Sequence, residues 1–569
     1  MSAALRDLRA LEALRLSAGR AAADTRRALL TRLQTAELPS ARAVARLHEA
    51  LCFVRAYPDD AALRAQAAAM LAGFAARTDL QRHRDALTGS GIAGTDIPYR
   101  FFAGQAHWLA ERWPAHLRLD RSDPGTEERV ARALPQLLTP MERHALRELG
   151  RPGYAALDRL CPAGVGDAVF LLRRVQRLVG GSHAREEFVD AMDAAMVLSA
   201  GPDTPCRSHA LFAPAPVVWR KQATERTRPD LRAALDRPPR RVRRLNRADG
   251  EALADLARAA MVTRARSLET FSFADARDAW LVDDGEGLSF GLLGLQPERR
   301  HALATLVGGL ILRNGVPVGY VQSDHVGASA ALSFNTFESF RGGEAAHLFA
   351  RWLAALRHVH GSTAFSIEPY QLGRGNDEAL DSGAWWFYAR LGFAPRDAAC
   401  RTLADREQAL RARRPKHRSS RATLERLAQA HLFFDADPQD AHPLMDLSAL
   451  GLDCGAALSA LGGADREAAL EAIAREVVRR GGLSQPPAFT GQQRAAWQAL
   501  LPLLAVLDTR AWSAHDYRQL VPLARAKAAR SEQAFVRALR EHAALGASLR
   551  AWARQNDAAR AATGRARGR

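Results

Sequence analysis

The chain contains almost no lysine and few cysteines. It has 80 basic residues, but lysine occurs only at positions 221, 416 and 527, so arginine carries nearly all of the positive charge. The five cysteines are far apart and form no C-x-x-C pair, which argues against a zinc knuckle or a disulfide framework. The apolar runs, such as residues 303–312, are well short of the roughly 20 residues that a membrane helix needs. We therefore expect no bound metal and no membrane partner.

A secretory signal is also missing. The segment after Met1 continues into a charged helical pattern, without the apolar stretch and cleavage site of a signal peptide. We therefore expect a cytoplasmic protein. The formal net charge of +18 permits attraction to nucleic acid, but the arginines are interleaved with 62 acidic residues, so net charge alone is weak support for such a partner.

The length of 569 residues predicts several structural units, because a single core stops growing well below this size. Helical periodicity dominates residues 1–236, and prolines at the end of that region prevent helix continuation. Strand-like and helical patterns alternate in residues 237–400. Residues 401–569 return to helical patterns, and within them residues 411–421 carry six fixed positive charges, a pattern typical of a solvated basic linker.

The central region begins with patterns for a strand, a helix and a hairpin. Residues 241–245 are predicted to form a strand and residues 249–265 an amphipathic helix. Two apolar runs follow at 303–312 and 316–326, and Asn314-Gly315 lies between them. An Asn-Gly pair between such runs is a strong signal for a hairpin.

A second strand and helix follow in residues 332–356. Apolar and polar side chains alternate from Leu332 to Phe337, as in a strand, and apolar residues then recur at helical spacing from Ala345 onward. Between them, Gly342 and Gly343 have no Cβ that would keep a ligand at a distance. The first N–H groups of a helix have no partner within the helix, so this junction is suited to binding a pyrophosphate.

A third strand is predicted at 363–367, and an aromatic helix then ends in Tyr388-Ala389-Arg390-Leu391-Gly392-Phe393. In this order of elements the central region resembles the GNAT superfamily of acyl-CoA-dependent N-acyltransferases. That family has a phosphate loop of the form Gln/Arg-x-x-Gly-x-Gly/Ala and a later helix ending in Tyr-x-x-x-Gly-Phe. The second signature is matched in full. The resemblance covers about residues 238–400.

The phosphate loop matches in either of two registers. With Arg341 at the leading position, Glu344 stands where glycine is usual. With Phe340 at the leading position, Gly343 falls on the glycine. Glu344 either repels phosphate or faces solvent in the first helical turn, where the helix dipole favours a carboxylate.

The resemblance implies an α+β chain, with a central mixed sheet and helices flanked by mostly α-helical regions. It implies acetyl-CoA or another acyl-CoA as co-substrate, and a small-molecule or protein amine as acceptor. The strand before the phosphate loop and the strand after its helix are expected to splay apart around the thioester. The residues expected to bind the co-substrate are Phe337, Arg341, Gly342, Gly343, Glu344, Ala345, Ala346, Asn376 and Asp381. Asp381 stands where the family has an asparagine.

Three residues are candidates for the chemistry. Tyr388 matches the family's tyrosine near the sulfur, which gives a proton to the departing thiolate. Glu338 and Glu368, at the ends of two strands, are candidate general bases, and we rank Glu338 first. Asp324 and His325 end an earlier strand and remain alternatives, as does a water chain.

Acceptor recognition is less defined by the sequence. Phe271, Phe273 and Trp280 are expected to contribute to the acceptor pocket, as in related folds. The stretch 89–94 fits G-x-G-x-x-G but lacks a preceding strand and a following helix, so it is interpreted as a flexible loop. If this loop folds over the central cleft, we expect Asp96, Tyr99 and Arg100 to line that cleft.

Three hypotheses for function result. The first is an acyl-CoA-dependent N-acyltransferase, with the acetyl group as the expected acyl group. The second is a degenerate GNAT fold that binds or scaffolds without catalysis, favoured by Glu344 and Asp381. The third is an acyltransferase associated with nucleic acid, which depends on net charge and on residues 411–421.

Overall fold

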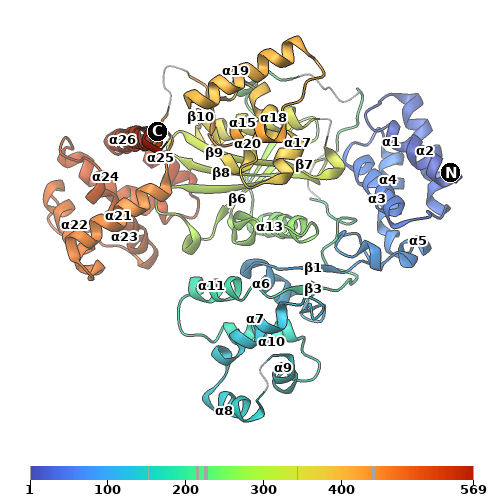
Figure 1. Ribbon diagram of the computed structural model, residues 1–569, viewed down its shortest axis with the longest axis horizontal. Helices are drawn as coiled ribbons and strands as arrows, with labels where there is room; N and C mark the ends of the chain where they lie inside the picture. The colour runs from blue at the N-terminus through green and yellow to red at the C-terminus, as the bar shows by residue number, and fades with distance from the viewer. Residues whose placement is uncertain are drawn as a thin grey trace.

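The computed structural model describes residues 2–150, 153–212, 217–222, 228–341, 344–437 and 442–567. The chain has an α+β fold. A central sheet lies in the middle of the molecule, with helical groups to either side and a smaller group below it (Figure 1). In the described part of the chain, no single helix is long and apolar enough to cross a membrane. Two consecutive helices, α21 (Leu447–Gly462) and α22 (Arg466–Gly481), reach that length and apolar character only when taken together, and the pair is bent by 92°.

Nine strands of the described residues form the central sheet, in the order β11-β12-β10-β9-β8-β7-β6-β5-β4. Neighbouring strands are antiparallel except for β9 and β10, which are parallel. The strands are β4 (Arg241–Arg244), β5 (Ala274–Gly285), β6 (Leu288–Leu295), β7 (Thr305–Arg313), β8 (Val316–Val326), β9 (Ser329–Thr336), β10 (Ala364–Ile367), β11 (Ala394–Pro395) and β12 (Leu432–Asp435).

The predicted Asn-Gly hairpin is confirmed. Strands β7 and β8 pair from Thr305 with His325 to Arg313 with Val316. Asn314 and Gly315 have φ values of 49° and 80°, the left-handed conformations that a two-residue hairpin turn requires. The preceding hairpin of β5 and β6 was not predicted. The buried positions of β6 are continuous, so this strand lacks the alternating pattern that marks a strand in a sequence.

Helices cover both faces of the sheet (Figure 1). On one face lies α13, which packs against β5. On the other lie α15, α17, α18, α19 and α20. The helices of this region are α12 (Leu231–Asp236), α13 (Arg247–Val262), α14 (Glu269–Ser272), α15 (Ala345–His360), α16 (Pro369–Leu372), α17 (Asp377–Ser382), α18 (Ala384–Arg390), α19 (Ala398–Arg413) and α20 (Arg421–Leu427).

The N-terminal region contains two separate groups of elements (Figure 1). The first is α1 (Ala3–Ala13), α2 (Arg20–Thr35), α3 (Ala41–Ala56), α4 (Ala61–Ala72) and α5 (Thr78–Arg82). The second surrounds a small sheet and comprises β1 (Ile97–Tyr99), α6 (Ala103–Arg112), β2 (Leu117–Leu119), α7 (Thr126–Ala133), α8 (Pro140–Leu149), α9 (Tyr154–Leu160), α10 (Asp167–Val175), α11 (Ser182–Met192) and β3 (Met196–Leu198).

The C-terminal helices form a bundle at one end of the sheet (Figure 1). They are α21 (Leu447–Gly462), α22 (Arg466–Gly481), α23 (Gly491–Val506), α24 (Ala514–Lys527), α25 (Gln533–Glu541) and α26 (Ala543–Arg567). The expectation that everything after residue 400 is helical was wrong at β12, which inserts between β10 and β11. Its alternating burial is typical of a strand, but four residues are too few to be conspicuous in the sequence.

The hydrophobic cores divide the chain differently from the predicted ranges. One core joins α1–α5 to the central sheet and its helices, from Ala4 to Phe434. A second core belongs to the β1–β3 group and a third to the C-terminal bundle. The first N-terminal helices are therefore part of the same packed unit as the sheet.

Candidate functional site

Strands β9 and β10 form a fork. Their parallel pairing runs from Ala364 with Ser329 to Ile367 with Leu332. Beyond that pair β9 continues to Thr336, paired only with β8 among the described strands. The chain leaves β10 through Pro369, which lacks an N–H group and begins α16. The last half of β9 therefore has an edge that faces away from β8 without a neighbouring strand.

A cleft of about 770 Å³ opens at this fork. Its volume lies within the range of small-molecule sites. The lining combines the end of β9, the loop after α13 and helices α16 to α18. The residues are Tyr99, Arg264, Ala265, Arg266, Ser267, Leu268, Tyr320, Ser333, Phe334, Asn335, Thr336, Arg341, Ala345, Tyr370, Gln371, Asn376, Glu378, Ala379, Ser382, Ala384, Phe387 and Tyr388.

The N-terminus of α15 lies between this cleft and a second hollow. Ala345 lines the cleft, and the next residue, Ala346, lines the second hollow. The Glu344 side chain makes no capping hydrogen bond to this helix, and the first N–H groups of a helix have no partner within it. The predicted loop residues Gly342 and Gly343 lie outside the described residues.

Glu344 has neither of the two roles expected for it. Its Oε2 accepts hydrogen bonds from Arg313 Nη2 at 2.5 Å and from the Tyr57 hydroxyl at 3.0 Å. The Arg313 side chain is buried, 8% exposed, and the Glu344 side chain is 17% exposed. The carboxylate is thus neutralised by a buried cation and ties the start of α15 to α3. The partner Tyr57 could not be predicted from the sequence, because it lies 287 residues away in the chain.

Tyr388 is buried yet reaches the cleft. Its residue is 3% exposed, and its ring packs against Phe349 and Phe393 at centroid distances of 5.4 and 6.1 Å. Burial raises the pKa of its hydroxyl, so the group stays protonated at neutral pH. The hydroxyl is therefore a potential proton donor within the cleft wall.

Glu378 holds two arginines at the cleft. Its Oε1 accepts from Arg341 Nη2 at 2.5 Å and its Oε2 from Arg266 Nη2 at 3.0 Å. These two hydrogen bonds lower the pKa of the Glu378 carboxyl, and the bond from Arg341 has the larger effect. All three residues line the cleft. Glu378 thus connects the loop after α13 to the predicted phosphate loop.

The second hollow is strongly basic. It has a volume of about 770 Å³ and shares Ser382 and Phe387 with the cleft. Its cationic residues are Arg228, Arg390, Arg411, Arg418 and Arg421. Two of them come from α19 and the turn that follows it. Asp381 is the acidic residue of the lining, 3.5 Å from Arg421.

The basic segment 411–421 is mostly exposed, as expected for a solvated segment, but it also contains the end of α19 and the first residue of α20. Arg411 lies 4.3 Å from the centroid of the Trp386 ring. Ser419 accepts a hydrogen bond from Trp386 Nε1 at 3.0 Å and donates one to Glu407 at 2.6 Å. Arg411, Arg418, Ser419 and Arg421 of this segment line the basic hollow.

The two predicted bases occupy different places. Glu338 lies in a 3-10 turn beside Arg15 and Glu49, in a smaller hollow formed with the N-terminal helices, and it does not line the cleft. Neither Glu338 nor Glu368 lines the cleft, so the ranking of the two as general bases stays a prediction. Glu368 directly follows β10 at the fork, where it and Asp324 line a third cavity on the sheet. His325 is buried between the hydroxyls of Ser323 and Ser362 instead.

Other expected residues are divided in the same way. Asn376 lines the cleft, where its side chain caps α17 and donates to the Tyr370 carbonyl oxygen at 3.2 Å. Phe337 is 4% exposed and lies outside the cleft lining, beneath Arg264 at 3.6 Å. Asp381 lies at the basic hollow and does not line the cleft.

The acceptor-side expectations need correction. Phe271, Phe273 and Trp280 do not line the cleft, and the side chains of the first two are buried elsewhere, at the short helix α14. The loop just before them, residues 264–268, lines it instead. Tyr99 reaches the cleft from the N-terminal region as expected.

Asp96 and Arg100 do not line the cleft, because their side chains pair within the N-terminal region. Asp96 lies near Arg84 and Arg118, and Arg100 binds Asp123 and Asp193. No group of three or more potential metal ligands has the geometry to hold a metal ion in the described ranges.

No protein-family model matches the chain, and searches of curated proteins and of solved structures also find no match.

Proposed function

We propose that the chain is an acyl-CoA-dependent N-acyltransferase with a GNAT-like catalytic unit. The observation that carries the proposal is the fork between β9 and β10, because its cleft contacts the start of α15 and the ring of Tyr388. A splayed pair of parallel strands, a helix N-terminus after the first strand and a tyrosine beside the gap are the parts that the resemblance implies.

The two hollows fit the shape of the co-substrate. The free edge of β9, residues 333–336, offers backbone groups to the amides of the pantetheine arm. The N-terminus of α15, between the hollows, is placed for the pyrophosphate. The arginines of the basic hollow then face the phosphate of the adenosine end.

Transfer requires a neutral amine, a stabilised oxyanion and a proton for the leaving thiolate. The amine nitrogen attacks the thioester carbonyl carbon, and a C–N bond forms as the C–S bond breaks. Tyr388 is the group that donates a proton to the sulfur, because burial raises the pKa of its hydroxyl and the proton is therefore present when the thiolate forms.

The non-catalytic alternative loses one of its two arguments. Glu344 had favoured it as a repulsive charge at the phosphate loop, but its carboxylate is bound by Arg313. Asp381 lies beside Arg421 at the basic hollow, so its charge is also partly compensated.

The proposal is tested by thiol release from acetyl-CoA in the presence of a panel of amines. We expect amine-dependent release by the full chain. Release that is the same with and without every amine, together with no saturable binding of acetyl-CoA, overturns the proposal.

A further inference from the structure

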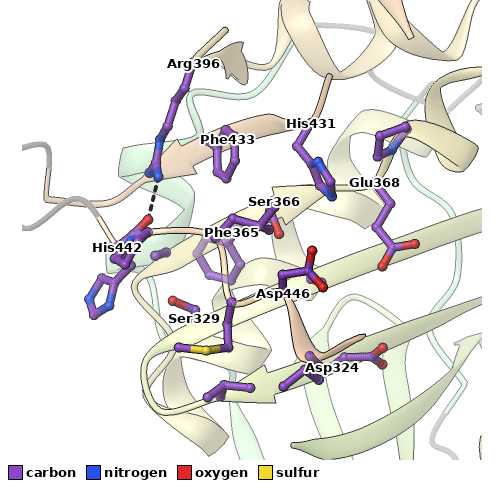
Figure 2. Close-up of a pocket in the computed structure, with 18 of the residues that line it drawn as sticks. Asp324, Ser329, Phe365, Ser366, Glu368, Arg396, His431, Phe433, His442 and Asp446 are labelled. Atoms are coloured by element: carbon purple, nitrogen blue, oxygen red, sulfur yellow. Dashed lines mark hydrogen bonds between the residues drawn. The ribbon is translucent and has the colours of Figure 1, made fainter. Parts of the chain in front are cut away.

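A third cavity, of about 690 Å³, lies on the sheet beside the fork (Figure 2). Its floor comes from β8, β9, β10 and β12, and its lid from residues 442–452, which lead into α21. The lid belongs to the C-terminal region and begins 42 residues beyond residue 400, where the segment that resembles the GNAT family ends. The proposed function uses none of this cavity.

The cavity lining as a whole, floor and lid, carries the carboxylates of Asp324, Glu368, Asp435 and Asp446 and the guanidinium groups of Arg374 and Arg396. Figure 2 shows Asp324, Glu368 and Asp446 turned toward one shared space, with Ser366 and His431 beside it. Asp446 accepts a hydrogen bond from Ala449 N at the start of α21. Burial is the main cause that raises the pKa of Asp324 to about 6; a hydrogen bond from Gln322 opposes the rise, and the nearby charges of Glu368 and Glu269 add to it.

The arginine beside these carboxylates is already engaged. Arg396 donates to Asp435 Oδ2 at 2.7 Å and to the His442 carbonyl oxygen at 2.5 Å, and it lies over the Phe433 ring at 3.9 Å. The other oxygen of Asp435, Oδ1, is buried and has no hydrogen-bond partner among the described residues. Arg374 is exposed at the rim. The cavity therefore favours a cation.

The lid supplies the opposite chemistry. Residues Pro443, Leu444, Met445, Leu447 and Leu452 line the cavity from that side. Leu452 is 76% exposed, unusual for a leucine in a folded helix. An apolar wall opposite a carboxylate floor suits a ligand with an apolar body and a positively charged end.

The cavity lies next to the fork between β9 and β10. Ala331 of β9 pairs with Asp324 on one side and with Ser366 on the other. The next pair, Leu332 with Ile367, is the last before the strands separate, and Glu368 follows it directly. Tyr370 lines both the cavity and the cleft.

We propose that this cavity is the acceptor site and that the acceptor is an amphipathic primary amine, with its ammonium group at Glu368 and Asp324 and its apolar body under the lid. This inference rests on the proposed function. The bound ammonium gives one proton to the Glu368 carboxylate, and the neutral nitrogen then attacks the thioester carbon. The Tyr388 proton passes to the thiolate, and the second nitrogen proton returns through water to the Tyr388 oxygen, so that the products are the amide, free CoA thiol and protonated Glu368.

The test measures amine binding without any acyl-CoA. Phenethylamine is titrated into the full chain by calorimetry, beside 2-phenylethanol and 3-phenylpropionate as neutral and anionic analogues. We expect saturable binding of the amine, at least tenfold weaker binding of both analogues, and at least fivefold weaker amine binding in Glu368→Gln. Leu452→Asp is expected to weaken the amine as well, since it places a polar group in the apolar wall.

Glu251→Gln is the matched control, because Glu251 is an exposed carboxylate on α13 that lines none of the cavities described above. Equal binding of amine and alcohol, or unchanged binding in Glu368→Gln, overturns the inference. Binding of spermidine without binding of phenethylamine overturns the amphipathic class. Acetyl-CoA is titrated separately, so loss of the proposed function, in which acetyl-CoA fails to bind, is distinguished from loss of the acceptor site.

Discussion

Ile367 of β10 pairs with Leu332 of β9, and this is the last pair between the two strands. Both proposals, for the acyl-CoA site and for the acceptor site, depend on the residues that follow this pair. On the side of α15 and α18 the gap becomes the cleft that contains Tyr388, and beside it on the sheet lies the acidic cavity with Glu368. The cleft thus contains the proposed proton donor, and the neighbouring cavity contains the proposed carboxylate.

Replacing Tyr388 by phenylalanine tests the proton donor. We expect turnover to fall by about 100-fold, the lower end of the range for general acid catalysis, with little change in the KM for acetyl-CoA. The fold is expected to be unaffected, because the ring contacts with Phe349 and Phe393 are retained. Steady-state thiol release measures both constants. Full turnover in the variant would show that another group protonates the thiolate.

Replacing Glu344 by glutamine tests the anchor of α15. The change leaves the buried Arg313 guanidinium without its counter-charge, and breaking such a pair costs about 3 kcal/mol. We expect the thermal unfolding midpoint to fall by several degrees. Glu425→Gln serves as the control, since Glu425 pairs with Arg421 at an exposed site and its loss is expected to leave the midpoint unchanged. An unaltered midpoint for Glu344→Gln contradicts the anchoring role.

Replacing Glu378 by glutamine releases Arg341 and Arg266. Both guanidinium groups then face the cleft without an anionic partner there, so phosphate groups compete with no carboxylate. We expect CoA to bind about threefold to tenfold more tightly, as measured by calorimetry. The effect is expected to shrink in high salt, because exposed charges are screened. Weaker CoA binding in the variant would mean that Glu378 positions the arginines for the ligand.

Replacing Asp324 by asparagine tests the raised pKa. In the folded chain this carboxyl has a pKa of about 6, above its ordinary value of 3.8, so the folded state holds the proton more tightly. The wild type is expected to lose stability as the pH rises from about 4 to about 6, by about 1 to 3 kcal/mol. The variant lacks this loss and is expected to be the more stable protein at pH 7. Denaturant unfolding at pH 4 and pH 7 measures the difference, and an equal difference at both pH values contradicts the raised pKa.

The local part of the fold was accessible from the sequence. Asn314 and Gly315 specify their turn because few other residues adopt the conformations that it requires. The pairing of β7 with β8 is therefore predictable from the sequence. The helix α13 was predicted at 249–265 and spans Arg247–Val262, since its apolar stripe repeats over four turns.

The parts that depend on distant contacts were not accessible. Tyr57 binds Glu344 from 287 residues away, and nothing near either residue indicates the pair. The lid of the acidic cavity, 442–452, lies far from β8 in the chain. Glu338 was ranked above Glu368, although both residues follow strands. The turn after β9 directs Glu338 toward the N-terminal helices. Periodicity reports which face of an element is buried, not which distant segment covers it.

The central claim is that the N-terminus of α15 captures the phosphates of CoA. Calorimetric titration of CoA into the wild type, Ala345→Asp and Ala345→Asn tests it most directly. Aspartate in the first turn favours the helix through its dipole but repels phosphate, whereas asparagine is similar in size and neutral. We predict one saturable site in the wild type, binding within about threefold in Ala345→Asn, and at least tenfold weaker binding, about 1.4 kcal/mol, in Ala345→Asp. No saturable binding by the wild type, or equal binding by both variants, would contradict the account.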